Sequence, residues 1–145
     1  MKGNDGFYCG AALALKNGDI VTGKNSSLMH SASSCIINAV KQLAGIDDSV
    51  HLLAPEIVDS VVRMKRDVLK SRHASLDLDE TLIALGTSAS GSPEAEAALQ
   101  QLKNLEGCEM HISHLPPPGD EAGLRKLGIN LTCDPKFASR DLFMD

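Results

Sequence analysis

Hydrophobic and polar positions change their period along the chain, and each change predicts an element. An apolar run over 7–15 is followed by an Asn17-Gly18 pair and by a second run over 19–23, which is the pattern of a β-hairpin with a tight turn. Over 28–44 the apolar positions recur every three to four residues, and a glycine follows as a stop signal. The chain is therefore predicted to open with two antiparallel strands and a long amphipathic helix.

The rest of the chain alternates short apolar runs with helical patterns. We expect a buried strand over 50–53, helices over 55–69, from Asp77 or Asp79 through Leu85, over 93–105 and over 120–127, and strands over 108–115 and 129–133. The order β-β-α-β-α-α-α-β-α-β predicts a mixed sheet with helices on both faces, because parallel neighbours need helical crossovers. The expected fold class is α/β, a three-layer α/β/α sandwich with a mixed sheet, and residues 1–145 are expected to form a single α/β domain.

Charge and hydropathy narrow the class of protein. The formal net charge of -5 argues against a nucleic-acid partner, which would need clustered Lys and Arg. No apolar stretch is long enough for a membrane span, and no apolar segment follows the first charged residue as in a secretory signal. The four cysteines are far apart and lie among apolar neighbours: Cys9, Cys35, Cys108 and Cys133. They are typical of buried thiols in a reducing compartment, so we expect a cytoplasmic protein without a membrane partner.

The connection between the second strand and the first helix is the best candidate for a ligand site. Exposed N–H groups at a helix start, together with an ammonium and hydroxyls, can bind a small anion. In this hypothesis Lys24 supplies charge, Asn25 and Ser26 supply hydrogen bonds, Ser27 caps the helix, and His30 and His111 supply polar contacts. The alternative is that one of Asn25, Ser26 and Ser27 caps the helix and does nothing more.

Two sharper interpretations of these residues are not favoured. The spacing Gly18-x-x-x-x-Gly23-Lys24 resembles a P-loop, but Asn25 stands where the motif needs Ser or Thr, and the intervening residues are predicted as strand. Glu109 and His111 share one face of a strand while His114 points away, so this strand supplies too few ligands for zinc. We expect no metal and no cofactor.

Other candidate catalytic groups have structural explanations. Asp77, Asp79 and Glu80 lie at a helix start, where carboxylates complement the helix dipole. Cys35 lies on the apolar face of the first helix, and the sequence identifies no base for it. The sequence therefore leaves open whether this chain catalyses a reaction, and it identifies no catalytic residue.

Several strings of the sequence resemble one known family. They are Gly23-Lys24-Asn25-Ser26-Ser27, the helix end from Ile37 to Ile46, His51-Leu52-Leu53, Gly107-Cys108-Glu109-Met110-His111 and Gly128-Ile129-Asn130-Leu131-Thr132. Together, and over nearly the whole chain, they resemble the C-terminal domain of the prokaryotic domain-of-unknown-function family 1846, whose members are much longer. The resemblance implies a cytidine-deaminase-like topology in a cytosolic protein. It implies no deaminase chemistry, because the chain has neither a His-x-Glu nor a Pro-Cys-x-x-Cys motif.

Two functions of different classes remain. The first is a domain that binds a small anionic metabolite, bearing phosphate or carboxylate, as part of a larger enzyme-like protein that completes the active site. The second is an assembly module in which apolar helix positions such as Ile57, Val61 and Val68 dock copies of the protein together. A homo-oligomer is expected in either case, and catalysis by this chain alone is the least favoured alternative.

Overall fold

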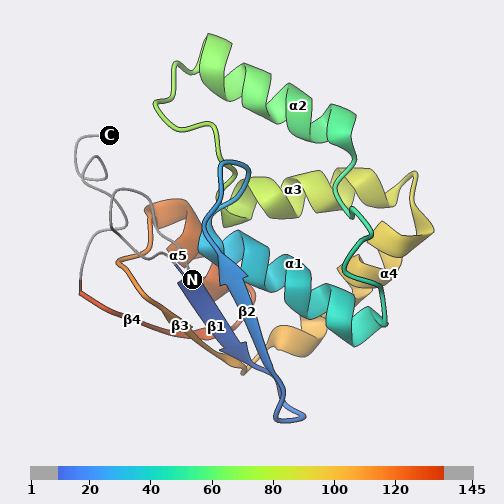
Figure 1. Cartoon of the computed structure of the whole chain (residues 1–145), viewed down its shortest axis with the longest axis vertical. Coiled ribbons are helices and arrows are strands. Elements are labelled where there is room, and N and C mark those ends of the chain that lie inside the picture. The colour runs from blue at the N-terminus through green and yellow to red at the C-terminus, as the bar shows by residue number, and fades with distance from the viewer. Residues whose placement is uncertain (1–9, 136–145) are drawn as a thin grey trace.

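The computed structural model describes residues 10–135, which contain a four-stranded mixed sheet (Figure 1). The strands β1 (Gly10–Ala14), β2 (Ile20–Lys24), β3 (Glu109–Ile112) and β4 (Asn130–Cys133) lie in the order β2-β1-β3-β4. Strand β1 pairs antiparallel with β2 and with β3, whereas β3 and β4 are parallel. The α/β class, the mixed sheet and these strands are confirmed; the part of the first strand predicted over 7–9 lies outside the described residues.

The first two strands are joined by the predicted tight turn. The backbone N–H of Gly18 donates to the carbonyl of Leu15 over 3.0 Å, and the Asn17 side chain accepts from the N–H of Asp19 over 2.9 Å. Gly18 has a φ of 96°, a conformation that favours glycine. Local chemistry therefore fixes the hairpin and its register.

Five α-helices account for about half of the remaining described chain. They are α1 (Ser31–Ala44), α2 (Pro55–Arg63), α3 (Leu78–Ala89), α4 (Pro93–Gln100) and α5 (Pro118–Lys126). Helix α2 continues as a π-helical segment, Met64–Val68, and α4 continues as a 3₁₀ segment, Gln101–Leu105. The helical spans predicted over 55–69 and 93–105 are thus present, with a change of helix type near the end of each.

The helices lie at increasing distances from the sheet (Figure 1). Helix α1 packs on β1 and β2, and α5 packs against both β4 and α3. Helices α3 and α4 contact each other and α1, while α2 lies at the outer edge of the molecule against α3. This order brings the starts of α1, α3 and α5 to the same side of the molecule.

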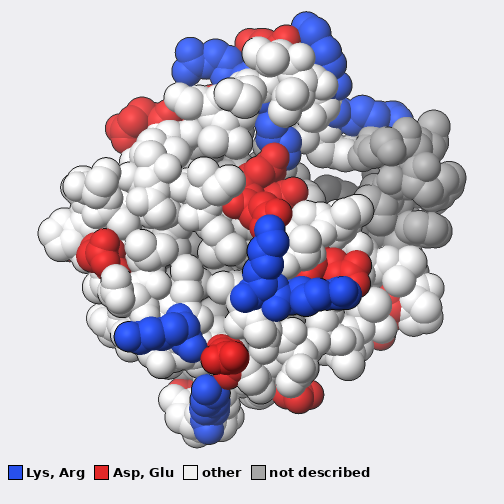
Figure 2. Space-filling view, turned by 180° about the vertical axis from the view of Figure 1, so that it is seen from behind, with Lys and Arg blue, Asp and Glu red and all other residues white. Residues whose placement is uncertain are grey.

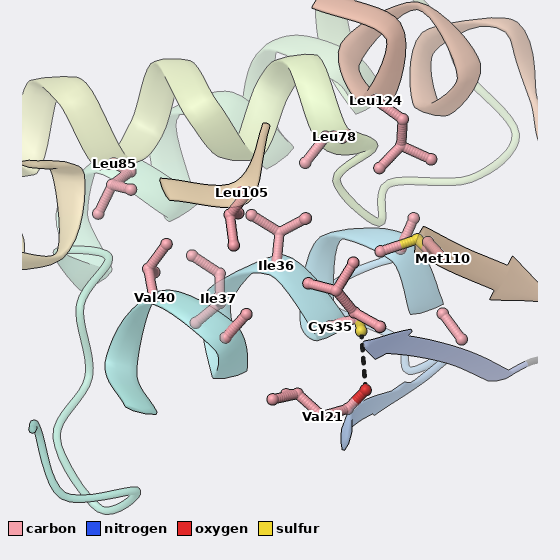
Figure 3. Close-up of a cluster of buried hydrophobic side chains, with 14 of the residues drawn as sticks. Val21, Cys35, Ile36, Ile37, Val40, Leu78, Leu85, Leu105, Met110 and Leu124 are labelled. Carbon is pink, nitrogen blue, oxygen red and sulfur yellow. Dashed lines mark hydrogen bonds between the residues drawn. The ribbon is translucent and has the colours of Figure 1, made fainter. Parts of the chain in front are cut away.

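The hydrophobic core lies between α1, the sheet and the outer helices (Figure 3). Cys35 and Ile36 of α1 are fully buried, and so are Leu13 and Met110 of the sheet. The thiol of Cys35 donates to the carbonyl of Val21 over 3.4 Å, which ties α1 to β2 (Figure 3). The predicted burial of cysteines holds for Cys35 and for Cys108, whereas Cys133 is partly exposed and Cys9 lies outside the described residues.

Only one face of the sheet is covered by helices among residues 10–135. Met110 and Ile112 of β3 are buried on that face, whereas Glu109 and His111 on the other face are exposed. The connections from β2 to β3 and from β3 to β4 both cross the sheet in the same direction. Because crossover connections share one handedness, the helices of both connections lie on the same side of the sheet. Helical cover had been expected on both faces; in the described residues the second face is polar and open.

The strand predicted over 50–53 is wrong. Leu52 and Leu53 are buried, but this segment forms a loop. The N–H of Val50 donates to the carbonyl of Asp47 over 3.0 Å, and the N–H of Ala54 donates to a serine hydroxyl over 2.9 Å. A turn and a serine side chain therefore form the backbone hydrogen bonds that a neighbouring β-strand would otherwise have to form. The apolar side chains of this segment are buried although it is not a strand.

Charges on the surface are mixed in sign. Figure 2 shows basic and acidic side chains side by side on the back of the molecule, without a broad patch of either sign. One example joins α5 to α3, where the Lys126 ammonium lies 3.9 Å from the Asp79 carboxylate. None of the helices described within residues 10–135 has the length and apolar character that crossing a membrane requires.

Candidate functional site

His30 lies immediately before α1, and backbone hydrogen bonds to Leu76 hold its segment in place. Its backbone N–H donates to the carbonyl of Leu76 over 3.0 Å, and the N–H of Leu76 donates to the carbonyl of Leu28 over 2.8 Å. Met29 and Leu76 form an isolated parallel bridge between these bonds. The segment before α1 is therefore fixed in extended form, and it presents the His30 side chain to the rest of the helical layer.

The side chain of His30 contacts a buried carboxylate. Nδ1 of His30 lies 2.9 Å from Oδ2 of Asp120, whose side chain is 1% exposed, while the imidazole is 21% exposed. The other carboxylate oxygen, Oδ1, accepts from the backbone N–H of Leu78 over 2.9 Å. Both oxygens of Asp120 are thus engaged, and Nε2 is the His30 nitrogen left to meet a ligand.

Asp120 joins the starts of three helices. It lies in the first turn of α5, Leu78 is the first residue of α3, and His30 occupies the position before α1. The unpaired N–H groups at helix starts carry partial positive charge, so they stabilise a carboxylate placed among them. The convergence explains why a charged side chain can be almost completely buried here.

A second carboxylate cluster lies beside the first. Asp77 and Glu80 form a capping box at the start of α3: the Asp77 side chain accepts from the N–H of Glu80, and the Glu80 side chain accepts from the N–H of Asp77, each over 2.9 Å. The ammonium of Lys65 donates to Glu80 over 2.8 Å and to the carbonyl of Ser75 over 2.7 Å. The expectation that Asp77, Asp79 and Glu80 belong to a helix start is confirmed, because Asp77 is the cap of α3 and the other two lie in its first turn.

The close approach of Gly119 to this cluster requires a glycine. A Cβ added at Gly119 would lie 2.2 Å from Oδ2 of Asp77. The loop before α5 therefore packs directly against the capping box of α3. This packing holds Asp120, the next residue, within reach of both Leu78 and His30.

Neighbouring charges shift the pKa values of this cluster. Burial lowers the pKa of His30, but the hydrogen bond to Asp120 and the negative charges of Asp120 and Asp77 outweigh it, so that the pKa is raised above 6.5. Burial raises the pKa of Asp77, and the nearby carboxylates of Glu80 and Asp120 raise it further. His30 is consequently kept in its cationic form to higher pH than a free histidine.

His114 is a second histidine close to Asp120. It is 3% exposed, and its Nδ1 has no hydrogen-bond partner among residues 10–135. Burial lowers its pKa, and the charge of His30 lowers it further, against the opposing effect of Asp120. The two histidines therefore differ: His30 favours the imidazolium form and His114 the neutral one.

The connection predicted as an anion site has a different geometry from the one expected. Helix α1 begins at Ser31, not near residue 28, so Ser27 is not its cap. The hydroxyl of Ser26 accepts from the N–H groups of Leu28 and Met29 over 3.2 and 3.1 Å, which forms a local turn. The helix starts later because residues 28–30 are bonded to Leu76 in extended form.

The structure separates the six predicted ligand residues: Asn25, Ser26 and Ser27 lie on the connection between β2 and α1, and the other three lie in two further places. His30 lies with Asp120 on the helix-covered side. Lys24, at the end of β2, and His111, on β3, are exposed on the open face of the sheet. His111 is bonded there to Thr132 over 2.7 Å and to Asp134 over 3.1 Å.

The described chain contains no candidate metal centre, and Cys35 is not a candidate nucleophile. Residues 10–135 contain no group of three or more His, Cys, Asp or Glu side chains placed to hold a metal ion. Burial raises the pKa of Cys35 to about 12, so its thiol is not a nucleophile at neutral pH. The interpretation of Cys35 as a core residue is confirmed by its full burial.

Comparison with known proteins places the chain in a family. Residues 2–143 match the model of the domain of unknown function DUF1846, C-terminal. The chain belongs to this family. It is 43% identical over 134 residues to a UPF0371 protein of Corynebacterium urealyticum, which covers 92% of the chain and 27% of the relative. It is also 44% identical over 134 residues to one of Corynebacterium diphtheriae, with the same coverage, and 41% identical over 132 residues to one of Clostridioides difficile, covering 91% of the chain and 26% of the relative.

The family therefore matches the resemblance found in the sequence strings. The chain spans about a quarter of the length of these relatives. The match extends over both the His30 segment and the Asp120 segment. The cytidine-deaminase-like topology implied by that resemblance stays a prediction.

Sequence reasoning missed two members of this site, Asp120 and His114. Asp120 follows Pro118 in the first turn of a predicted helix, where a carboxylate already has an explanation in the helix dipole. His114 was considered only as a metal ligand. The signal that pairs Asp120 with His30 is a contact across 90 positions, which no local pattern contains.

Proposed function

We propose that this family domain binds a small anionic ligand, bearing phosphate or carboxylate, at the imidazole of His30, within a longer protein that completes the site. The observation that carries the proposal is the 2.9 Å contact between Nδ1 of His30 and the buried carboxylate of Asp120. This contact fixes the orientation of the ring and favours its charged form. It leaves Nε2 as a positioned donor for an anion.

The start of α1 supports the same ligand chemistry. His30 is the residue directly before Ser31, where a 14-residue helix begins. The partial positive charge of a helix start favours anions, and no acidic residue occupies the first turn of α1. Because Ser31, Ala32 and Ser33 are buried, a ligand oxygen at Nε2 would gain from this charge without a direct bond to their N–H groups.

The other predicted ligand residues have secondary places in this proposal. Asn25 and Ser27 lie on the connection that leads to His30, and Ser26 shapes its turn. Lys24 and His111 lie on the open face of the sheet, where they would meet a ligand only if it, or another part of the longer protein, reached that face. We therefore assign the central contact to His30 and test the other residues beside it.

Thermal unfolding of the purified chain with inorganic phosphate, sugar phosphates and carboxylates tests the proposal. A ligand at a hundred times its dissociation constant should add about 2.7 kcal/mol of stability. His30→Gln should abolish the shift, because it removes the imidazolium, whereas Lys16→Met removes an exposed positive charge from the turn between β1 and β2 and should preserve it. Lys24→Ala and His111→Gln show whether the open face contributes.

Two results would overturn this assignment. If no phosphate or carboxylate shifts the unfolding transition of the chain, His30 is not an anion site in this domain. If a shift occurs but survives His30→Gln and disappears in Lys24→Ala, the anion site lies at the end of β2. A shift lost only in His30→Gln supports the proposal.

An assembly role is the second candidate, and one specific observation favours it. The end of α2 and its π-helical continuation expose large apolar side chains: Met64 is 56% exposed, Val68 70% and Leu69 61%. Ile57 and Val61, by contrast, pack partly against the core of the same chain. The apolar surface that another copy could contact is therefore the C-terminal end of this helical segment, from Met64 to Leu69, and not the whole of α2.

A further inference from the structure

A cavity lies beneath α2 and extends to Leu28 and Met29, whereas His30, the next residue, does not line it. It has a volume of about 330 Å³ and lies between α1, α2 and the loop at 51–53. Its walls are mostly apolar, with Ile37, Leu53 and Val58 among them. Volume and lining are those of a site for a small organic molecule.

The cavity also contains a buried ammonium group. Lys41 lines it and is only 7% exposed, and its Nζ donates to the carbonyl of Asp48 over 2.9 Å. Within residues 10–135 no carboxylate lies within ion-pair distance of Lys41. Its charge acts on Asp47 from further away: hydrogen bonds from Ser49 lower the pKa of that carboxyl, and the Lys41 ammonium lowers it further. An ammonium whose one hydrogen-bond acceptor is a neutral carbonyl gains a charged partner from an anion that enters beside it.

We infer that this cavity binds a small monocarboxylate with an apolar tail, its carboxylate on Lys41 and its tail against the apolar walls. The tail is required because one ion pair would not by itself displace water from so apolar a cavity. A single negative charge is favoured because Asp59 also lines the cavity and opposes a second charge. The Lys41 end of the cavity is distinct from His30, which precedes α1 and lies 11 residues before Lys41, roughly 16 Å away along the helix axis.

Sodium octanoate and 1-octanol test the inference, because they share a tail and differ in charge. Titration of the chain, followed by methyl NMR, should show shifts of Leu52, Leu53 and Val58 methyl groups with both compounds. Octanoate should bind about tenfold more tightly than octanol, since a hydrogen bond to a charged group contributes that much or more. Equal affinities, or octanoate shifts elsewhere in the molecule, would overturn the inference.

Variants of Lys41 separate charge from packing. Lys41→Met should remove the preference for octanoate and leave octanol binding unchanged, whereas Lys41→Arg should keep the preference. Lys16→Met, at an exposed lysine, is the matched control. Octanoate binding that is unchanged in a folded Lys41→Met, or a preference lost in a folded Lys41→Arg, contradicts the assignment.

The His30 variant keeps this test independent of the anion site proposed above. His30→Gln should leave octanoate binding unchanged, because the two sites lie at different parts of α1. If His30→Gln abolishes octanoate binding and Lys41→Met does not, the carboxylate lies at His30, and the cavity is not the binding site.

Discussion

At the residue scale, the contact between His30 and Asp120 shows how one side chain can serve structure and chemistry together. Asp120 satisfies the N–H of Leu78 at the start of α3 and orients the His30 ring at the start of α1. A buried carboxylate with both oxygens engaged makes a rigid support for an imidazole. The site therefore depends on how the starts of the helices are packed, and not on a flexible loop.

Asp120→Asn should reverse the pH dependence that His30 confers on stability. In the native chain the raised pKa of His30 means that the folded state favours the imidazolium. The resulting stabilisation of the fold is complete below the pKa of the unfolded chain, 6.5, and it is lost as the pH rises through the pKa of the folded chain. Without the Asp120 charge, burial dominates and should move the pKa of His30 below 6.5. NMR titration of the imidazole measures both values.

Chemical denaturation on either side of pH 6.5 checks the same variant. Breaking this contact should cost about 2–3 kcal/mol below pH 6.5 and less above it. His51→Gln, at an exposed histidine, is the control and should leave the profile unchanged. An unaltered His30 pKa in Asp120→Asn would show that the carboxylate does not set the charge of the ring.

At the element scale, β2 and α1 pack so closely that only a glycine fits between them at position 23. A Cβ added at Gly23 would lie 2.3 Å from the backbone N of Cys35 and 2.7 Å from the carbonyl oxygen of Ser31. These are main-chain atoms of a helix, so they cannot move without displacing α1. Gly23, which belonged to the predicted anion segment, has a packing role: it lets α1 lie directly against β2.

Gly23→Ala should destabilise the chain by roughly 1–3 kcal/mol or more, because α1 must separate from β2. Gly86→Ala is the matched control: an added Cβ meets nothing within 4 Å at this exposed position of α3, and the change should stabilise the helix by roughly 0.5–1 kcal/mol. Urea denaturation of both variants measures the difference. Equal effects would show that β2 and α1 do not meet as closely as described.

At the scale of the whole molecule, residues 10–135 present two surfaces that none of their helices covers. One is the open face of the sheet with Lys24 and His111, and the other is the apolar end of α2 with Val68 and Leu69. The chain spans about a quarter of the relatives it matches. Both surfaces are therefore available to the remainder of a longer protein or to a second copy.

We expect the purified chain to self-associate through the end of α2, because three large apolar side chains lie exposed together there. Val68→Lys should then shift the sedimentation profile towards the monomer. Ile83→Lys is the matched control, since Ile83 is 68% exposed on α3 and Val68 is 70% exposed. Two results would contradict this surface assignment. The chain could sediment as a monomer at all concentrations, or both substitutions could dissociate the oligomer equally.

Patterns within a few residues determined the hairpin at Asn17-Gly18, the helices with their stops and the capping box at Asp77, because neighbouring residues alone satisfy those backbone groups. Tertiary structure decided the rest. It left the apolar run at 50–53 as a loop, delayed the start of α1 to Ser31, and brought Asp120 to His30. These outcomes depend on which distant groups satisfy a hydrogen bond or a charge, and a linear sequence does not contain those distances.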